Sequence, residues 1–319
     1  MIRQNNYLYI CFQKRQQLKK LNSKFEGHLL ALTANVMWGL MSPIGKAALL
    51  FFSAVTLTTF RMVGAAIAFW ILSLFFKREQ VSRHDKLMMF FASLFALVFN
   101  QGTFIFGLSL TSPVDASIMA TTLPIVTMIV AAIYLKEPIT NKKVTGIVVG
   151  AIGALILIQS SQVMSNNGSS MMGNLLCLAA QFSFAIYLTV FKGLSQRYSP
   201  ITLNKWMFLY ASLCFLPFSY KDIAAIQWVE VPAIAITEVL FVVLCGSFLG
   251  YLCLISAQRL LRPTVVSMYN YLQPIVATIV SVTMGVASFG LEKGLAIALV
   301  FLGVYIVTKS KSRQDLENK

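Results

Sequence analysis

Apolar side chains fill long blocks of this chain, and short polar stretches separate one block from the next. A block of about 20 apolar residues is long enough to cross the hydrocarbon core of a bilayer as a helix. Backbone groups in lipid must find hydrogen-bond partners within their own segment, so each block is expected to be a helix and not an isolated strand. The predicted spans are residues 28–50, 55–76, 87–108, 114–135, 144–160, 172–192, 201–219, 234–256, 264–285 and 291–308.

The order of residues in these blocks repeats once along the chain. Residues 113–158 align with 263–308 at a constant offset of 150, and residues 27–61 align with 173–207 at an offset of 146. Each copy holds five spans, and an odd number of spans inserts the second copy upside down. Inverted repeats are typical of transporters whose two halves rock around one central site. We therefore predict an all-α integral membrane protein with ten transmembrane helices, arranged as two inverted five-helix repeats.

The repeats divide the chain into five expected parts. The connector between the copies is uncharged and rich in Ser, Asn and Gly, which favours a flexible linker on the outer face. The parts are a basic cytoplasmic extension at residues 1–27, a first repeat at 28–160, the linker at 161–171, a second repeat at 172–308 and a cytoplasmic tail at 309–319.

Composition and charge narrow the class of protein. Hydrophobic residues make up 57% of the chain and charged residues 12%, whereas about a quarter of the residues in soluble domains are charged. The loops are too short for a separate nucleotide-binding or enzymatic domain. Of the 26 Lys and Arg residues, 21 fall on one side of the predicted topology and two on the other. This split predicts cytoplasmic termini, so the net charge of +15 reports topology and contact with the bilayer, not with nucleic acid.

Neither a metal site nor an enzymatic site is evident in the sequence. The five cysteines have no spacing typical of metal ligands, so we expect no metal and no cofactor. His28 and His84 lie at the edges of spans, no pair of acidic residues faces inward, and no phosphate-binding loop occurs. We therefore expect no catalytic residues and no enzymatic activity.

Polar residues inside apolar spans are costly unless they have a partner or line a wet cavity. Asn35 and Gln181 occupy equivalent positions in the two copies, and an uncharged amide pair with aromatic neighbours suits an amphipathic or zwitterionic substrate. The alternative for any single amide is an ordinary hydrogen bond between helices. The candidate residues of a substrate cavity are Asn35, Trp38, Asn100, Gln101, Gln181, Tyr187, Tyr251, Tyr269, Asn270, Tyr271 and Gln273.

Prolines and buried cations add further candidates. Pro124 and Pro274 are equivalent in the two copies and are expected to kink their helices, either as hinges beside the cavity or as structural kinks alone. Arg61 lies about six residues inside the second span, where it either binds a substrate carboxylate or extends to the interface. Lys46, at the end of the first span, carries the same two alternatives.

The acidic residues suggest how transport is coupled. No Asp or Glu falls in the middle third of any predicted span. Proton-coupled carriers use buried carboxylates, so the chain is expected to be a facilitator or an exchanger, unless Glu238 near an outer end is its proton site. The pattern Gly146-x3-Gly150 predicts close helix packing, either within the bundle or across a homodimer.

Several motifs occur in the order typical of one family. The first copy contains Trp38-Gly39, Phe60-Arg61, the run Leu-Pro-Ile-Val within residues 116–126, Tyr134-Leu135-Lys136-Glu137-Pro138 and Gly146-x3-Gly150-x2-Gly153, and the second contains Tyr271-Leu272-Gln273-Pro274-Ile275-Val276 and Gly303-Val304-Tyr305. The chain after residue 27 resembles the EamA family of the drug/metabolite transporter superfamily. One departure is Gly285-Val286-Ala287, where this family usually carries a Gly-Glu pair.

The resemblance implies a secondary transporter that exports small metabolites, such as amino acids and related compounds. Uptake, or transport of a sugar, a purine or a lipophilic toxicant, is equally compatible with the polar residues of the spans. A channel or a membrane scaffold is the remaining alternative, although the paired prolines favour alternating access. The lack of a clear targeting sequence favours a bacterial inner membrane.

Overall fold

The computed structural model describes residues 23–41, 44–45, 47–110, 119–160, 171–283 and 290–311. Within those ranges the chain is almost entirely helical, and none of the described residues forms a strand. The prediction of an all-α protein is therefore confirmed. The predicted linker and most of both tails lie outside the described residues.

The helices of the first copy follow the predicted spans. They are a first helix at residues 23–41, α2 (Ala54–Ser73), the continuous series α3 (Arg83–Ser93), η1 (Leu94–Phe99) and α4 (Asn100–Leu110), then α6 (Leu123–Tyr134) and α7 (Asn141–Ser160).

The second copy repeats this order with one short addition, α9, before its second long helix. The elements are α8 (Met171–Val190), α9 (Lys192–Arg197), α10 (Pro200–Ala224), the continuous series α11 (Ala233–Phe241), η2 (Val242–Leu249) and α12 (Gly250–Leu260), the series α13 (Pro263–Met268), η3 (Tyr269–Tyr271) and α14 (Leu272–Thr283), and α15 (Leu291–Thr308).

Several of these elements are suited to a bilayer. Among the described residues, six helical segments are long and apolar enough to cross a membrane, and α6 is apolar but shorter. The six are Ala54–Ser73, Arg83–Gly107, Met171–Val190, Pro200–Ala224, Ala233–Leu260 and Leu291–Thr308. Helical structure also occupies the described part of every other predicted span. The total of ten crossings stays a prediction.

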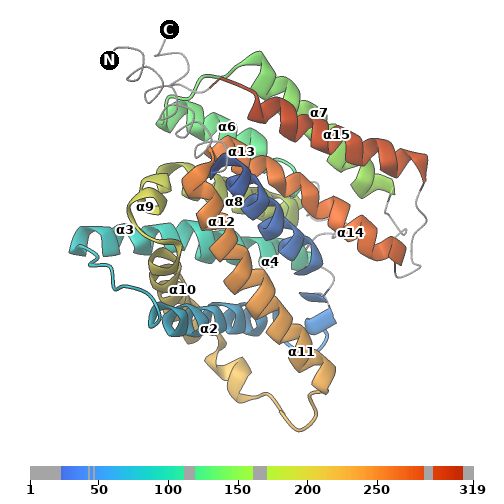
Figure 1. The fold of residues 1–319 in the computed structure, drawn as a ribbon. Coiled ribbons are helices and arrows are strands. Elements are labelled where there is room, and N and C mark those ends of the chain that lie inside the picture. Colours follow the sequence, from blue (N-terminus) through green and yellow to red (C-terminus); the bar gives the residue numbers. More distant parts are fainter. Residues whose placement is uncertain are drawn as a thin grey trace, which may run out of the picture.

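The helices pack as expected of two similar halves. The equivalent helices α2 and α10 pack against each other, and so do α7 and α15, which lie side by side at one edge of the bundle (Figure 1). Other contacts also occur in equivalent pairs. The helix α2 of the first copy packs on η2 of the second, and its equivalent α10 packs on η1, the equivalent of η2. The fold is thus built around an approximate twofold axis that relates the copies.

The pair α7–α15 shows this relation at the level of single residues. A Cβ atom on Gly153 would lie 2.6 Å from the carbonyl oxygen of Ala296, and one on Gly303 would lie 2.6 Å from that of Gly146. The offset of 150 converts each contact into the other. Small residues let the two backbones touch, so the Gly146-x3-Gly150 face is occupied by α15 of the same chain.

Two equivalent helices contain π-helical segments in their middles. These segments, η1 and η2, interrupt the third helix of the first copy and its counterpart in the second copy. A π-helical turn displaces backbone carbonyls from their usual partners and is frequent at functional sites. Nothing in the apolar sequences Leu94–Phe99 and Val242–Leu249 signals this change of helical geometry.

The prolines break their helices rather than kink them. Pro124 falls in the first turn of α6, after a turn at residues 121–122 that follows a helical piece at 119–120. Pro274 is the third residue of α14 and follows the 3-10 segment η3. A proline in a first turn costs its own helix no hydrogen bond, because the N–H of that position has no partner within that helix, although a carbonyl of the preceding segment can lose its donor.

Candidate functional site

A buried arginine organises the first polar cluster. The Arg61 side chain, on α2, is only 4% exposed and lies inside the bundle rather than at its end. Its Nε donates to the hydroxyl of Ser247 on η2 at 3.1 Å, and its Nη1 donates to Oε1 of Gln101 on α4 at 2.9 Å. Its Nη2 is buried and has no hydrogen-bond partner among the described residues. The sequence allowed two positions for this side chain, and the structure shows the internal one.

Gln101 connects the arginine to the second copy. Its Nε2 donates to the hydroxyl of Tyr251, the residue 150 positions further on, at 3.2 Å, and to Oδ1 of Asn100 at 3.0 Å. The Tyr251 hydroxyl donates to the carbonyl of Ala96 in η1, and Asn100 donates to the carbonyl of Ala180 in α8. We call Arg61, Asn100, Gln101, Ser247 and Tyr251 the arginine cluster.

Three amides form a second cluster. Nε2 of Gln273, on α14, donates to Oδ1 of Asn35 on the first helix at 3.1 Å and to Oδ1 of Asn270 on η3 at 2.6 Å. Asn35 itself donates to the carbonyl of Ala31. We call Asn35, Asn270 and Gln273 the amide cluster. It joins the first helix of one copy to the broken helix of the other copy.

The amide cluster also repairs the break at Pro124. Proline cannot donate to the carbonyl four residues before it, which here belongs to Ala120. Nδ2 of Asn270 donates to that carbonyl at 3.1 Å. Asn270 and Ala120 are equivalent at the offset of 150, so this bond crosses the approximate twofold axis. A polar residue of the second copy thus satisfies the backbone of the first.

Trp38 lies between the two clusters. It follows Asn35 by one turn on the first helix, and its Nε1 donates to the carbonyl of Gly246, next to Ser247, at 2.8 Å. Its ring centroid is 5.4 Å from that of Tyr251. Trp38, Gln101 and Gln273 are each partly exposed, while Arg61 is buried behind them in the same region. An amphipathic molecule would meet polar groups at both ends of this region and aromatic rings between them.

Other predicted cavity residues lie elsewhere. Tyr271 is buried beneath Gly150 of α7 and donates to the carbonyl of Ile147 at 3.4 Å, which makes it a packing residue. The Tyr269 hydroxyl lies 2.7 Å from Nδ1 of His28. Tyr187 stacks on Phe184, and its buried hydroxyl has no partner among the described residues.

The remaining candidates are Gln181, Lys46 and Glu238. Gln181 is buried on α8, and within the described residues no hydrogen bond joins it to either cluster. Lys46 lies outside the described residues. Glu238 lies on α11 before η2, and its Oε2 is buried without a hydrogen bond in the part of the chain that the structure describes.

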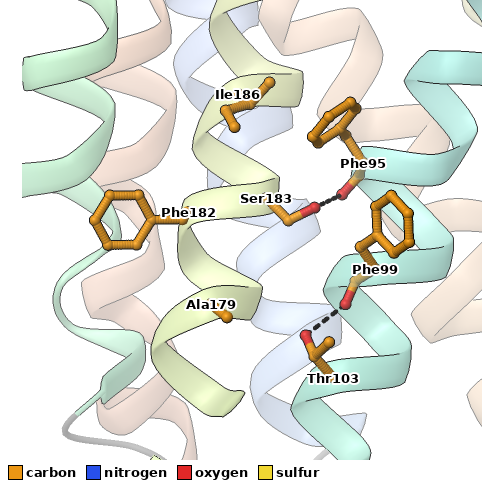
Figure 2. Close-up of a pocket in the computed structure, with 7 residues that line it drawn as sticks. All are labelled: Phe95, Phe99, Thr103, Ala179, Phe182, Ser183 and Ile186. Carbon is orange, nitrogen blue, oxygen red and sulfur yellow. Dashed lines mark hydrogen bonds between the residues drawn. The ribbon is translucent and has the colours of Figure 1, made fainter. Parts of the chain in front are cut away.

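An apolar groove runs along the outside of this region. It has a volume of about 440 Å³ and is lined by Phe95, Phe99, Thr103, Ala179, Phe182, Ser183 and Ile186. Figure 2 shows that the Ser183 hydroxyl donates to the Phe95 carbonyl of η1 across the groove, at 2.7 Å. The lining has no charged group, so the groove lacks the means to recognise a polar solute. Its polar atoms instead satisfy the carbonyls of the π-helical segment.

Two matching contacts hold the ends of α2 and α10. Ser53 and Ser199, equivalent at the offset of 146, cap the N-termini of these helices. The Ser53 hydroxyl donates to Asp222 at 2.9 Å, which we call the Ser53 latch. The Ser199 hydroxyl and backbone N–H donate to Glu79 at 2.9 and 3.0 Å, which we call the Ser199 latch. Because α2 and α10 run in opposite directions, the latches lie at opposite ends of the pair.

The Ser199 latch has further support. Burial raises the pKa of Glu79, but hydrogen bonds from Thr202 and Ser199 outweigh this effect and hold that pKa below its ordinary value. Beside it, Arg197 lies 2.9 Å from Asp85, whose other oxygen accepts from the Tyr198 hydroxyl at 2.6 Å. The Ser53 latch is the simpler of the two in the described structure.

The ion pairs within the described ranges lie outside the two clusters. Glu137 pairs with Lys143 at 2.7 Å after α6, and Arg197 pairs with Asp85. Among those residues no three His, Cys, Asp or Glu side chains gather in a way that would hold a metal ion. The polar centre of the described structure therefore consists of one cation with amides, hydroxyls and aromatic rings, groups that can bind a solute.

Sequence reasoning missed the backbone part of the site. Ser247 and the carbonyls of Gly246, Ala96 and Ala120 complete the two clusters, yet they belong to apolar or small-residue runs. The spacing Gly246-x3-Gly250 was an available signal, since a Cβ on Gly250 would lie 2.9 Å from Nε1 of Trp38. The π-helical geometry that presents Ser247 to Arg61 has no such signal.

A two-copy helical bundle with apolar spans and a buried polar centre defines a membrane transporter. The model of the EamA-like transporter family matches residues 25–159 and again residues 171–309. The chain belongs to this family, as its motifs suggested, and the resemblance to the drug/metabolite transporters is confirmed. The two matches also confirm the two-repeat fold.

Relatives support the same class. The chain is 26% identical over 286 residues to an uncharacterized transporter of Archaeoglobus fulgidus, covering 89% of this chain and 98% of that one. It is 22% identical over 281 residues to the uncharacterized transporter YyaM of Bacillus subtilis, covering 87% and 92%. One crystal structure superposes with a TM-score of 0.74 at 14% identity, covering 88% of this chain and 96% of the other, which shows a shared fold.

Proposed function

We propose that this multi-pass membrane transporter is a secondary carrier that exports amino acids or related small metabolites by alternating access. The observation that carries the proposal is the pair of polar clusters at the junction of the two copies, with Trp38 between them. Polar groups at this depth are costly, and their arrangement gives an amphipathic or zwitterionic solute a polar contact at each end.

The proposed topology places the protein in a bacterial inner membrane with both termini in the cytoplasm. The division of basic residues, 21 on one side and two on the other, supports this orientation. It puts the Ser199 latch at the cytoplasmic end of α2 and α10 and the Ser53 latch at the opposite end.

The proposed mode of transport is facilitated diffusion or exchange. Neither cluster contains a carboxylate among the described residues, so neither offers the usual proton relay. The second candidate is proton-coupled transport through Glu238, which the buried and unbonded Oε2 of that side chain supports. Uphill accumulation driven by a pH gradient, lost in Glu238→Gln, would favour this second candidate.

The first test is metabolite profiling of spent medium from cells that overproduce the intact chain. We expect a few amino-acid-like compounds to be enriched, and Gln273→Ala to lower that enrichment at least about fivefold because it removes both bonds of the amide cluster. Gln227→Ala is the matched control, since Gln227 is an exposed amide on a loop.

A second measurement separates a carrier from a channel. In proteoliposomes, a carrier takes up labelled solute faster when unlabelled solute is present inside, whereas a channel does not. The proposal fails if the intact chain neither enriches a compound in the medium nor shows such counterflow with an amino-acid mixture.

A further inference from the structure

The guanidinium of Arg61 has hydrogen-bond partners for only some of its nitrogen atoms. Its Nε and Nη1 have partners, but Nη2 is buried without one in the described part of the chain. A guanidinium is always charged and offers a planar fork of donors that fits two oxygens of one carboxylate. The fork formed by Nη1 and Nη2 currently holds one neutral amide oxygen, from Gln101.

The charge of Arg61 has no acidic partner in the part of the chain that the structure describes. The ion pairs found there join Lys143 to Glu137 and Arg197 to Asp85. A buried charge in a bilayer protein is normally paired or marks a pathway for a solute. The residue equivalent to Arg61 in the second copy is Met207, which is fully buried. Within the described residues, the cation therefore has no counter-charge, and its equivalent in the second copy is uncharged.

Gln101 is placed where it could yield to a ligand. It is partly exposed, whereas Arg61 behind it is buried. Its Nε2 already donates to Tyr251 and Asn100, and these bonds do not depend on the contact between Oε1 and Nη1. If Gln101 rotates away from Nη1, both free donors of the fork become available while Ser247 still holds Nε.

We propose that Arg61, Gln101 and Ser247 form a carboxylate-binding subsite, in which a carboxylate of the solute replaces the Gln101 oxygen and occupies the fork of Nη1 and Nη2. The inference rests on the proposed carrier function and specifies its substrates as carboxylic acids. Ser247 positions the guanidinium, and Gln101 occupies the fork when no solute is bound. The amide cluster binds the other, uncharged or ammonium-bearing end of the solute.

The test uses phenylglyoxal, which modifies arginine, on the full chain in lipid nanodiscs. The modified residues are located by peptide mapping. The probes are acid and amide pairs of nearly equal shape, namely benzoate with benzamide, succinate with succinamide and L-leucine with L-leucinamide, at constant ionic strength. We expect at least one acid to slow modification of Arg61 by about tenfold while its amide does not. Arg78, on an exposed loop, should react equally in all samples.

Two variants separate ligand binding from a purely structural role. Gln101→Glu places a permanent carboxylate on the fork, so Arg61 should be protected without any added acid, and no acid should protect it further. Gln101→Ala leaves the fork open, so Arg61 should react faster than in the native chain and still be protected by acids. A structural arginine would show no dependence on added acids in the native chain or in Gln101→Ala.

A maleimide reaction at Gln273→Cys shows whether the central region opens at all. If Cys forms an adduct at position 273 but Arg61 is unreactive, or is protected equally by acid and amide, the carboxylate subsite is wrong while the carrier proposal stands. If neither position reacts, no solute reaches the centre, and both proposals are overturned.

Discussion

At the scale of single residues, the polar side chains of the centre donate hydrogen bonds to backbone carbonyls at irregular points of the helices. Asn270 bonds the carbonyl that Pro124 leaves free, Trp38 bonds the carbonyl of Gly246 at a π-helical segment, and Tyr251 bonds that of Ala96 in the other one. Each donor comes from the opposite copy of the repeat. The side chains that could contact a solute therefore also determine how the two copies fit together.

This dual role predicts an energetic coupling between Asn270 and Pro124. Asn270→Ala should lower the free energy of unfolding by about 1–3 kcal/mol, because the Ala120 carbonyl loses its donor. In a Pro124→Ala background the new N–H at position 124 can bond that carbonyl, so the cost of Asn270→Ala should fall by about 1 kcal/mol. The free energy of unfolding is measured in detergent micelles for the native chain, the two single variants and the double variant.

A control for this cycle is Pro217→Ala. Pro217 lies inside α10, away from the Ala120 carbonyl, so its effect and that of Asn270→Ala should simply add. If the effects of Asn270→Ala and Pro124→Ala on the free energy of unfolding also simply add, Asn270 does not compensate for the proline.

Sequence reasoning identified the polar residues better than their partners. The rule that a polar side chain in a span needs a partner selected Asn35, Gln101 and Gln273 from residue type alone, and the structure joins each of them to another helix by a hydrogen bond. It also selected Tyr271, which the structure places beneath Gly150, since a tyrosine in a cavity and one in a packed seam look alike in sequence. Ser247 was missed because its role depends on π-helical backbone.

At the scale of elements, the irregular segments η1, η2 and η3 all border the centre, together with regular helices such as α2, whereas α7 and α15 at the edge are regular throughout. η1, η2 and η3 all contribute a side chain or a carbonyl to the clusters, while α7 and α15 pack through glycines and contribute none. Helix positions were predictable from apolar blocks alone. Breaks in the regular helical geometry were predictable only at the prolines, because a proline is known from the sequence to lack a backbone N–H.

The seam of α7 and α15 makes a prediction about stability. Gly303→Ala adds a Cβ 2.6 Å from the carbonyl of Gly146 and should destabilise the protein by about 1–3 kcal/mol through overpacking. Gly193→Ala is the matched control, because a Cβ there meets nothing within 4 Å. Thermal unfolding in detergent compares the two variants, and equal midpoints would show that the seam can separate at no cost.

At the scale of the whole molecule, the two latches connect the same pair of helices at opposite ends. Glu79 and Asp222 occupy matching roles in the two copies, each accepting from the serine that caps the other copy's second helix. Repeat matching in the sequence predicted the equivalence of Ser53 and Ser199, but not their acidic partners, because Glu79 lies in the loop after α2 whereas Asp222 lies in the last turn of α10.

The latches predict opposite effects on access to the centre. In the proposed topology, Glu79→Gln should weaken the cytoplasmic end and Asp222→Asn the other end, each by about 1 kcal/mol, which corresponds to roughly a fivefold change in a conformational equilibrium. Labelling of Gln273→Cys in oriented vesicles should therefore become about fivefold faster from the cytoplasmic side in the first variant and from the outer side in the second.

The assignment of the two latches to opposite ends would be contradicted if Glu79→Gln accelerated labelling from the outer side and Asp222→Asn from the cytoplasmic side. It would also be contradicted if both variants accelerated labelling equally from both sides. Asp85→Asn serves as a comparison, since Asp85 supports only the Ser199 latch through Tyr198 and Arg197. It should change labelling in the same direction as Glu79→Gln.

The reciprocal glycine contacts of α7 and α15 also bear on how such a chain arose. A contact in which Gly153 meets Ala296 while Gly303 meets Gly146 is isologous, as in a symmetric dimer of identical subunits. A single five-helix ancestor that inserted into the membrane in both orientations would meet its own copy through this surface. Gene duplication and fusion would then have freed each half to diverge, and the arginine at position 61, where the second copy has methionine at the equivalent position 207, is a product of that divergence.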